Sequence, residues 1–133
     1  MVILITGVSS GFGLEMAKAL SQKGHTIYGT VRRDVEHIAG VNYLNADVRD
    51  EESVIKAVEE VIRREGFIDV LINNAGLALG LDKEYEGDFD DWDTMIDTNI
   101  KGLLNMTRFV VPAMVERNEG HIINIGSVAG DAA

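Results

Sequence analysis

The chain has 133 residues, a formal net charge of −10 and no cysteine. This length suits one compact domain, and the lack of cysteine excludes disulfides and zinc–thiolate sites and fits a reducing, cytoplasmic compartment. The acidic balance argues against nucleic-acid binding, and no apolar stretch is long enough to span a membrane.

The first predicted element is a buried parallel strand over the apolar run Val2–Ile5, followed by a glycine-rich turn and a helix over Phe12–Lys23. This order opens a nucleotide-binding βαβ unit. Glycines let a backbone approach a pyrophosphate, and the N–H groups of a helix start point at its charge, although glycines can also simply form a loop. The residues expected to bind the cofactor here are Gly7, Ser9, Ser10, Gly11, Phe12 and Gly13.

Strands and helices continue to alternate after Gly24, which is typical of the residue that closes a helix. An irregular stretch through Arg33 and Gly40 separates the second and third strands, and Pro112 could kink the last helix or divide it in two. The expected elements are strands over Thr26–Val31, Asn42–Asn45, Val70–Asn73 and His121–Ile125, a helix from the capping residue Asp50 to Gly66, and a helix from about Phe89 to Met114.

This alternation predicts an α/β fold with a Rossmann-type, doubly wound parallel sheet in three α/β/α layers, formed by a single domain over 1–133. Right-handed crossovers give the strand order 3-2-1-4-5, with the ligand crevice at the carboxyl ends of strands 1 and 4. Polar motifs follow all five strands at that edge: residues 6–13, Arg32-Arg33, Asp47, Asn73-Asn74-Ala75-Gly76 and Ser127.

The residues after strand 2 favour NADP over NAD. NAD sites place an acidic residue there for the ribose 2′-hydroxyl, whereas NADP sites supply arginine for the 2′-phosphate. The chain has Arg32-Arg33, with Asp34 only afterwards, and the competing interpretation is a pair of surface arginines. Asp47 could accept a hydrogen bond from the adenine amino group or could be a turn residue beside a helix.

Asn73-Asn74-Ala75-Gly76 can be read as a simple turn or as a cofactor motif. In the second interpretation an amide cross-links strands, and the small residues leave room for a ribose or nicotinamide ring.

The acidic run between Asp82 and Asp93 is interpreted as a solvated surface loop in preference to an acidic docking site. The histidines His25, His37 and His121 show no ligand spacing, so we expect no metal site.

Taken together, these motifs resemble the short-chain dehydrogenase/reductase family along the whole chain. The matching stretches are Thr6-Gly7-x-x-x-Gly11-x-Gly13, Asn73-Asn74-Ala75-Gly76 and, on the adenine side, Asp47-Val48. The resemblance implies cofactor binding by Asn74, Ala75 and Gly76 and catalytic roles for Asn99 and Ser127. It is greatest to the NADP-dependent 3-hydroxy acid (serine or malonic semialdehyde) type, which implies a small hydroxy acid or carbonyl substrate.

One part of the family pattern is missing, because no Tyr-x-x-x-Lys occurs anywhere in the chain. In the family this pair supplies the general acid, so we expect the chain to be an amino-terminal part that also lacks the later strands. Two hypotheses stay open: an NADP-dependent oxidoreductase, or a catalytically incomplete dinucleotide-binding or assembly module. The resemblance also implies a homo-oligomer through the helix around Asn99 to Met114, whose apolar residues are equally consistent with a monomer.

Overall fold

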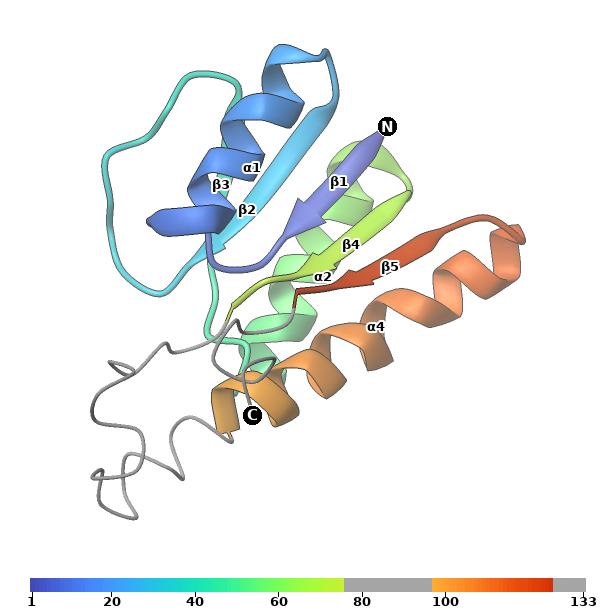
Figure 1. Ribbon diagram of the computed structural model, residues 1–133. Helices are drawn as coiled ribbons and strands as arrows, with labels where there is room; N and C mark the ends of the chain where they lie inside the picture. The colour runs from blue at the N-terminus through green and yellow to red at the C-terminus, as the bar shows by residue number, and fades with distance from the viewer. Residues whose placement is uncertain (76–96, 126–133) are drawn as a thin grey trace, which may run out of the picture.

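A computed structural model describes residues 1–75 and 97–125 of the chain, with the side chains of 97 and 98 left aside. The strands form one five-stranded, all-parallel sheet in the order β3-β2-β1-β4-β5 (Figure 1), as the sequence predicts. Their bounds are β1 Val2–Ile5, β2 Thr26–Val31, β3 Val41–Asn45, β4 Val70–Asn73 and β5 His121–Asn124.

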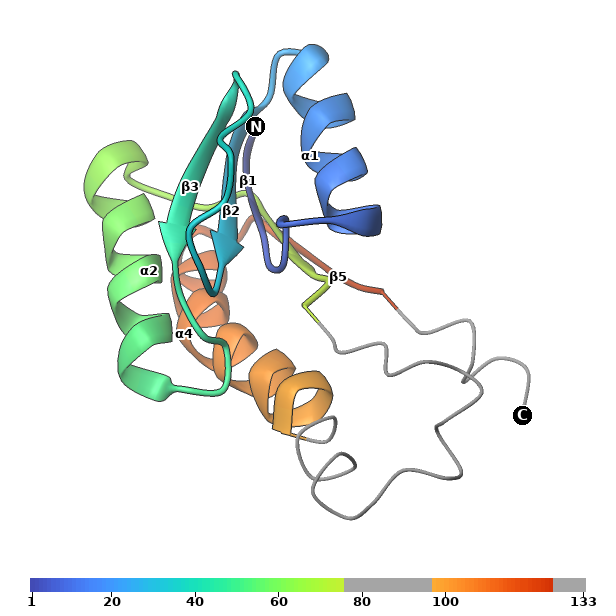
Figure 2. The same cartoon turned by 90° about the vertical axis from the view of Figure 1, so that its left-hand side faces the viewer.

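The helices cover both faces of this sheet. Figure 2 shows α1 (Gly11–Gln22) on one face and α2 (Glu51–Glu65) with α4 (Gly102–Arg117) on the other. A π-helical turn, η2 (Asp97–Lys101), leads directly into α4. The predicted three-layer α/β/α arrangement is therefore confirmed.

The two faces bury separate apolar clusters, because neighbouring residues of a strand point to opposite sides of a sheet. In β1, Val2 and Leu4 pack under α2 and α4, whereas Ile3 and Ile5 pack under α1. All four are buried, which explains why a continuous aliphatic run forms this strand. From α4, Met106 and Val110 enter the first cluster, whereas Leu104 is exposed.

The helix ends follow local sequence signals. Asp50 caps α2 by accepting a hydrogen bond from the Glu52 backbone N–H at 3.2 Å, and Gly66 ends this helix with a φ of 88°. Pro112 lies inside α4, which continues to Arg117, so the interpretation that the proline divides the helix in two was wrong. The expected start of that helix near Phe89 lies outside the described residues.

The crossover from β2 to β3 is unusual, because residues 32–40 contain no helix. A parallel crossover commonly takes a dozen or more residues and includes a helix. Here an irregular segment returns the chain to Val41, and Val35 within it packs against the apolar cluster under α1. The sequence predicted this irregular stretch correctly.

Asp69 joins three elements at the amino edge of the sheet. Its Oδ2 accepts a hydrogen bond from the Val2 backbone N–H at 2.7 Å, and its Oδ1 lies 3.6 Å from Nη1 of Arg117 at the end of α4. The Arg117 guanidinium also lies 4.4 Å from the ring centre of Phe67. These contacts fasten the start of β1 and the end of α4 to the residue before β4.

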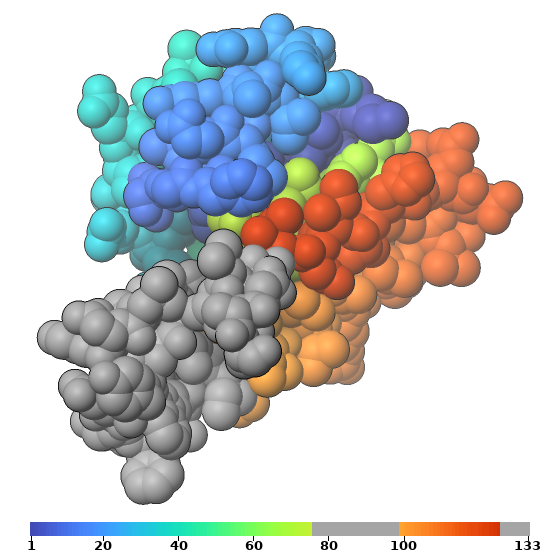
Figure 3. Space-filling view, in the orientation of Figure 1, coloured from blue at the N-terminus to red at the C-terminus, as the bar shows by residue number. Residues whose placement is uncertain are grey.

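Strand β5 lies at the edge of the sheet and is largely exposed. Ile122 packs toward α4, whereas Ile123 is 44% exposed on the opposite face. Figure 3 shows this strand at the surface beside the end of β4. Within 1–75 and 97–125, no helix is long and apolar enough to cross a membrane.

Candidate cofactor site at the carboxyl edge of the sheet

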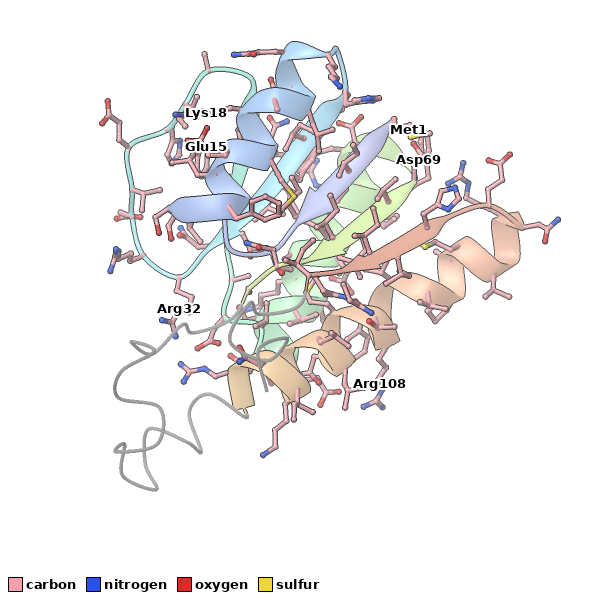
Figure 4. The ribbon with its side chains drawn as sticks, viewed as in Figure 1. Met1, Glu15, Lys18, Arg32, Asp69 and Arg108 are labelled. Atoms are coloured by element: carbon pink, nitrogen blue, oxygen red, sulfur yellow. The ribbon has the colours of Figure 1, made fainter. Side chains whose placement is uncertain are left out.

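The strand order brings the predicted motifs to one edge of the sheet. Figure 4 shows Arg32 at this carboxyl edge and Met1 and Asp69 at the opposite one. Residues 6–13 follow β1, Asp47 follows β3, and Asn74 and Ala75 follow β4. Gly76 and Ser127 lie outside the described residues, so their placement stays a prediction.

Thr6 joins the ends of the two central strands. Its Oγ1 accepts hydrogen bonds from the backbone N–H groups of Asn74 at 3.0 Å and Ala75 at 2.8 Å. The residue is only 1% exposed, and a buried hydroxyl that accepts two backbone donors holds the turn after β4 in place. The threonine thereby sets the distance between the glycine-rich turn and the segment Asn74-Ala75.

Thr30 of β2 supports the glycine-rich turn from the other side. Its Oγ1 accepts a hydrogen bond from the Gly7 backbone N–H at 3.0 Å, and its carbonyl oxygen accepts one from the Val8 N–H at 3.0 Å. The valine side chain then fills the space that a Cβ on Gly29 would need. The start of the turn is therefore attached to both strands that flank β1.

Asn74 and Gly13 both pack against the carbonyl group of Gly7 in the glycine-rich turn. The Asn74 side-chain amide donates a hydrogen bond to the Gly7 carbonyl oxygen at 3.0 Å. A Cβ on Gly13 would overlap that same carbonyl and the amide, so only glycine fits at this first turn of α1. This packing confirms that the amide of the motif cross-links strand ends.

The start of α1 is open for a ligand. Ser9, Ser10, Gly11 and Phe12 are exposed, and the Ser10 side chain makes no capping hydrogen bond. Gly11 has a φ of +63°, and a Cβ built there would meet nothing within 4 Å. Because the first N–H groups of a helix need external acceptors, this geometry fits a pyrophosphate.

Asn73 connects β4 to β5 and α4. Its Nδ2 donates to Oδ1 of Asn124 at 3.0 Å and contacts Oγ1 of Thr107 at 3.3 Å. The residue is 6% exposed, and its Oδ1 is a buried atom with no hydrogen-bond partner among the residues that the structure describes. The sequence predicted strand cross-linking at this edge, and the contact to α4 adds the helix that follows η2.

Arg32 and Arg33 are exposed at the end of β2, and Arg32 lies close enough to Asp47 to lower the pKa of its carboxyl group. The Asp47 carboxylate accepts hydrogen bonds from the Arg49 side chain, the shortest at 2.7 Å, and from the Arg49 backbone N–H at 3.0 Å. The Arg49 hydrogen bond, followed by the charges of Arg49 and Arg32, holds the pKa of Asp47 below its usual value. Asp47 therefore has the hydrogen bonds of a turn residue, since its carboxylate pairs with Arg49 two residues on.

Val48 is buried beneath the start of α4. Its carbonyl oxygen accepts a hydrogen bond from Nδ2 of Asn105 at 3.0 Å, and its side chain occupies the space that a Cβ on Gly102 would fill. The predicted adenine-side pair is thus attached to α4, which directly follows the turn η2 that contains Asn99. Single π-helical turns occur often at functional sites.

The sequence alone did not identify several of these supporting residues as part of the site. Thr30 and Asn105 carry no motif of their own, and their partners lie 23 and 57 residues away in the chain. Thr6 belongs to the recognised glycine-rich motif, but its pairing with Asn74 and Ala75 joins distant segments. A buried polar residue at a strand end is the signal that could have found Thr6 and Thr30. No cluster of three or more potential metal ligands occurs among the described residues.

The sheet order and the flanking helices together define an α/β protein of the doubly wound, Rossmann-like class. A model of the short-chain dehydrogenase family matches residues 1–133. The chain therefore belongs to the short-chain dehydrogenase family.

Two curated bacterial relatives extend this result. The chain is 47% identical over 137 residues to the NADP-dependent 3-hydroxy acid dehydrogenase of Salmonella typhi, covering 98% of this chain and 55% of that protein. It is 46% identical over 134 residues to a probable NADP-dependent dehydrogenase of Haemophilus influenzae, covering 96% and 53%. The chain thus spans about half the length of the curated relatives it matches.

Two solved structures share the same architecture. Serine dehydrogenase from Escherichia coli superposes with a TM-score of 0.86 at 43% identity, over 98% of this chain and 64% of that one. The closed form of serine dehydrogenase complexed with NADP+ gives a TM-score of 0.83 at 40% identity, over 98% and 56%. The sequence-based resemblance to this type of dehydrogenase is therefore confirmed, for the amino-terminal part of such proteins.

Proposed function

We propose that the chain is the amino-terminal, NADP-binding part of a cytoplasmic short-chain oxidoreductase. Its reaction is hydride transfer between the nicotinamide and a small hydroxy acid or carbonyl substrate. One observation carries the proposal: Thr6 joins Asn74 and Ala75 to the glycine-rich turn, beside an open α1 start and exposed Arg32. The named activities of the relatives support the choice of NADP and of substrate class.

In this proposal the single domain binds the cofactor along the carboxyl edge. The backbone N–H groups of residues 9–13 bind the pyrophosphate, while Arg32 and Arg33 pair with the 2′-phosphate. Asp47 and Val48 bind the adenine side. Asn74, Ala75 and Gly76 border the nicotinamide ribose.

The catalytic part of the proposal involves Asn99 and Ser127. The bound cofactor supplies or accepts the hydride. Ser127 would donate a hydrogen bond to the carbonyl oxygen of the substrate and thereby polarise it. Asn99, in the π-helical turn η2, would anchor the helix and a water that relays the proton. A positioned general acid typically contributes about 10²–10⁴-fold to such a reaction, and the chain contains no Tyr-x-x-x-Lys to provide it.

The test is a fluorescence titration of the chain with NADPH and NADH, before and after the double substitution Arg32→Ala and Arg33→Ala. Loss of charge-assisted hydrogen bonds should raise the NADPH dissociation constant about 10- to 100-fold and leave that of NADH unchanged. Arg63→Ala with Arg64→Ala is the matched control, since this adjacent pair lies on α2 and contacts Glu60. Equal weakening for both cofactors would refute the 2′-phosphate assignment.

The second candidate, a cofactor-binding or assembly module without catalysis, is favoured by the missing Tyr-x-x-x-Lys. Sustained NADPH oxidation by the chain with small aldehydes or 3-oxo acids would exclude it.

We also propose homo-oligomerisation through α4, because Leu104 and Val115 are 58% and 72% exposed on this helix. Sedimentation of Leu104→Lys against the unmodified chain tests that surface, and an unchanged molecular mass would contradict it.

A further inference from the structure

The β2–β3 crossover carries both arginines of the proposed 2′-phosphate site but has no helix to hold it. Arg32 and Arg33 are its first residues and are exposed. Helical crossovers are fixed by their own backbone hydrogen bonds, whereas an irregular segment depends on contacts to the rest of the fold. The position of the two guanidinium groups therefore depends on what attaches residues 32–40.

Tyr43 of β3 makes the central attachment. Its hydroxyl oxygen accepts a hydrogen bond from the Ile38 backbone N–H at 3.1 Å. Its ring stacks on His37, with 4.2 Å between the ring centres and 11° between the ring planes. Tyr43 also packs against the apolar cluster under α1, so it is a firm support for the segment.

Both ends of the crossover are fixed as well. Val31 pairs in register with Asn45, and its carbonyl oxygen accepts a hydrogen bond from the Ala46 N–H at 3.0 Å. At the far end, Oγ of Ser21 donates to the Gly40 carbonyl oxygen at 3.0 Å. Residues 32–36 lie between the fixed end of β2 and the stacked His37, and Val35 among them packs against the apolar cluster under α1.

We propose that Tyr43, with His37 stacked on it, is a positioning residue that presents Arg32 and Arg33 to the cofactor 2′-phosphate. The inference rests on the proposed function. Tyr43 itself does not touch the phosphate. Together with Val35, which packs under α1, it limits the motion of the segment after β2, and this lowers the entropy that the two arginines lose when they pair with the phosphate.

The experiment combines two variants with one control. Tyr43→Phe removes the hydroxyl and keeps the ring, whereas His37→Ala removes the stack. Asn42→Ala is the control, because the side chain of Asn42 on the same strand donates its hydrogen bond to the Ile27 carbonyl oxygen of β2 at 3.0 Å. Each variant is titrated with NADPH and NADH and digested briefly with trypsin, which cleaves after Arg32 and Arg33.

We expect both test variants to raise the NADPH dissociation constant about three- to tenfold, with unchanged NADH binding. They should also be cleaved faster after Arg32 and Arg33 than the control. The control should keep the full preference for NADPH. If Tyr43→Phe and His37→Ala weaken both cofactors equally, or are cleaved no faster than Asn42→Ala, the positioning role is overturned.

The same design separates this inference from the proposed function. An unmodified chain that shows no preference for NADPH, or a preference that survives Arg32→Ala with Arg33→Ala, refutes the proposed 2′-phosphate site and with it the role of Tyr43 in recognition. A preference that the arginine pair abolishes but Tyr43→Phe and His37→Ala leave intact refutes the inference alone.

Discussion

Replacing Thr6 by valine tests whether the join between β1 and the segment after β4 holds the site together. Valine has nearly the same shape, so the change removes the hydroxyl without leaving a cavity. Two backbone N–H groups, of Asn74 and Ala75, then lose their acceptor. At a net 0.5 to 1.5 kcal/mol for each hydrogen bond, the free energy of unfolding should fall by about 1 to 3 kcal/mol.

The assay is urea unfolding followed by circular dichroism, with Thr6→Ser as the matched control that keeps the hydroxyl. The serine variant should retain most of the stability, and NADPH binding should weaken only in the valine variant, because its turn at Asn74 and Ala75 is no longer held. A loss below about 0.5 kcal/mol in Thr6→Val, or an equal loss in both variants, would refute the reasoning.

Three further predictions concern other parts of the site. Gly13→Ala should destabilise the fold by about 1 to 3 kcal/mol in urea unfolding, since the new methyl group overlaps a carbonyl of the turn; an unchanged midpoint would contradict the close packing. The Arg49 hydrogen bond lowers the pKa of Asp47, so its stabilising effect is present above the unfolded-state pKa of about 4 and is lost as the pH falls through the folded pKa. The stability difference between the unmodified chain and Asp47→Asn should therefore shrink in acid, and a pH-independent difference would count against it. A double-mutant cycle of Asn73→Ala and Asn124→Ala should give a coupling of about 0.5 to 1.5 kcal/mol, whereas additive losses would mean that their amides do not interact.

The strands were predictable because burial on both faces leaves a strong signal. The runs Thr26–Val31 and Val70–Asn73 form β2 and β4 with the expected bounds. The cap at Asp50 and the glycine at Gly66 likewise set the limits of α2. In each of these places the determinants are neighbours in sequence, so local chemistry decides the structure.

The support of the site was not predictable in the same way. Thr30 meets Gly7, 23 residues away in the chain, only after β1 and β2 have paired. The continuation of α4 through Pro112 also depends on tertiary packing, because Met106, Val110 and Met114 are buried along it. Local propensity alone would have ended the helix before the proline.

Asp69 anchors the amino edge of the sheet, which lies opposite the edge of the proposed cofactor site. Its contacts to Val2 and Arg117 lie at the amino edge, opposite to Arg32 (Figure 4). Substitutions at the carboxyl edge therefore leave this anchor untouched. Libraries that vary Arg32, Arg33 and Asp34, and keep the packed Val35, can explore the proposed cofactor preference while the contacts of Asp69 keep β1, β4 and α4 assembled.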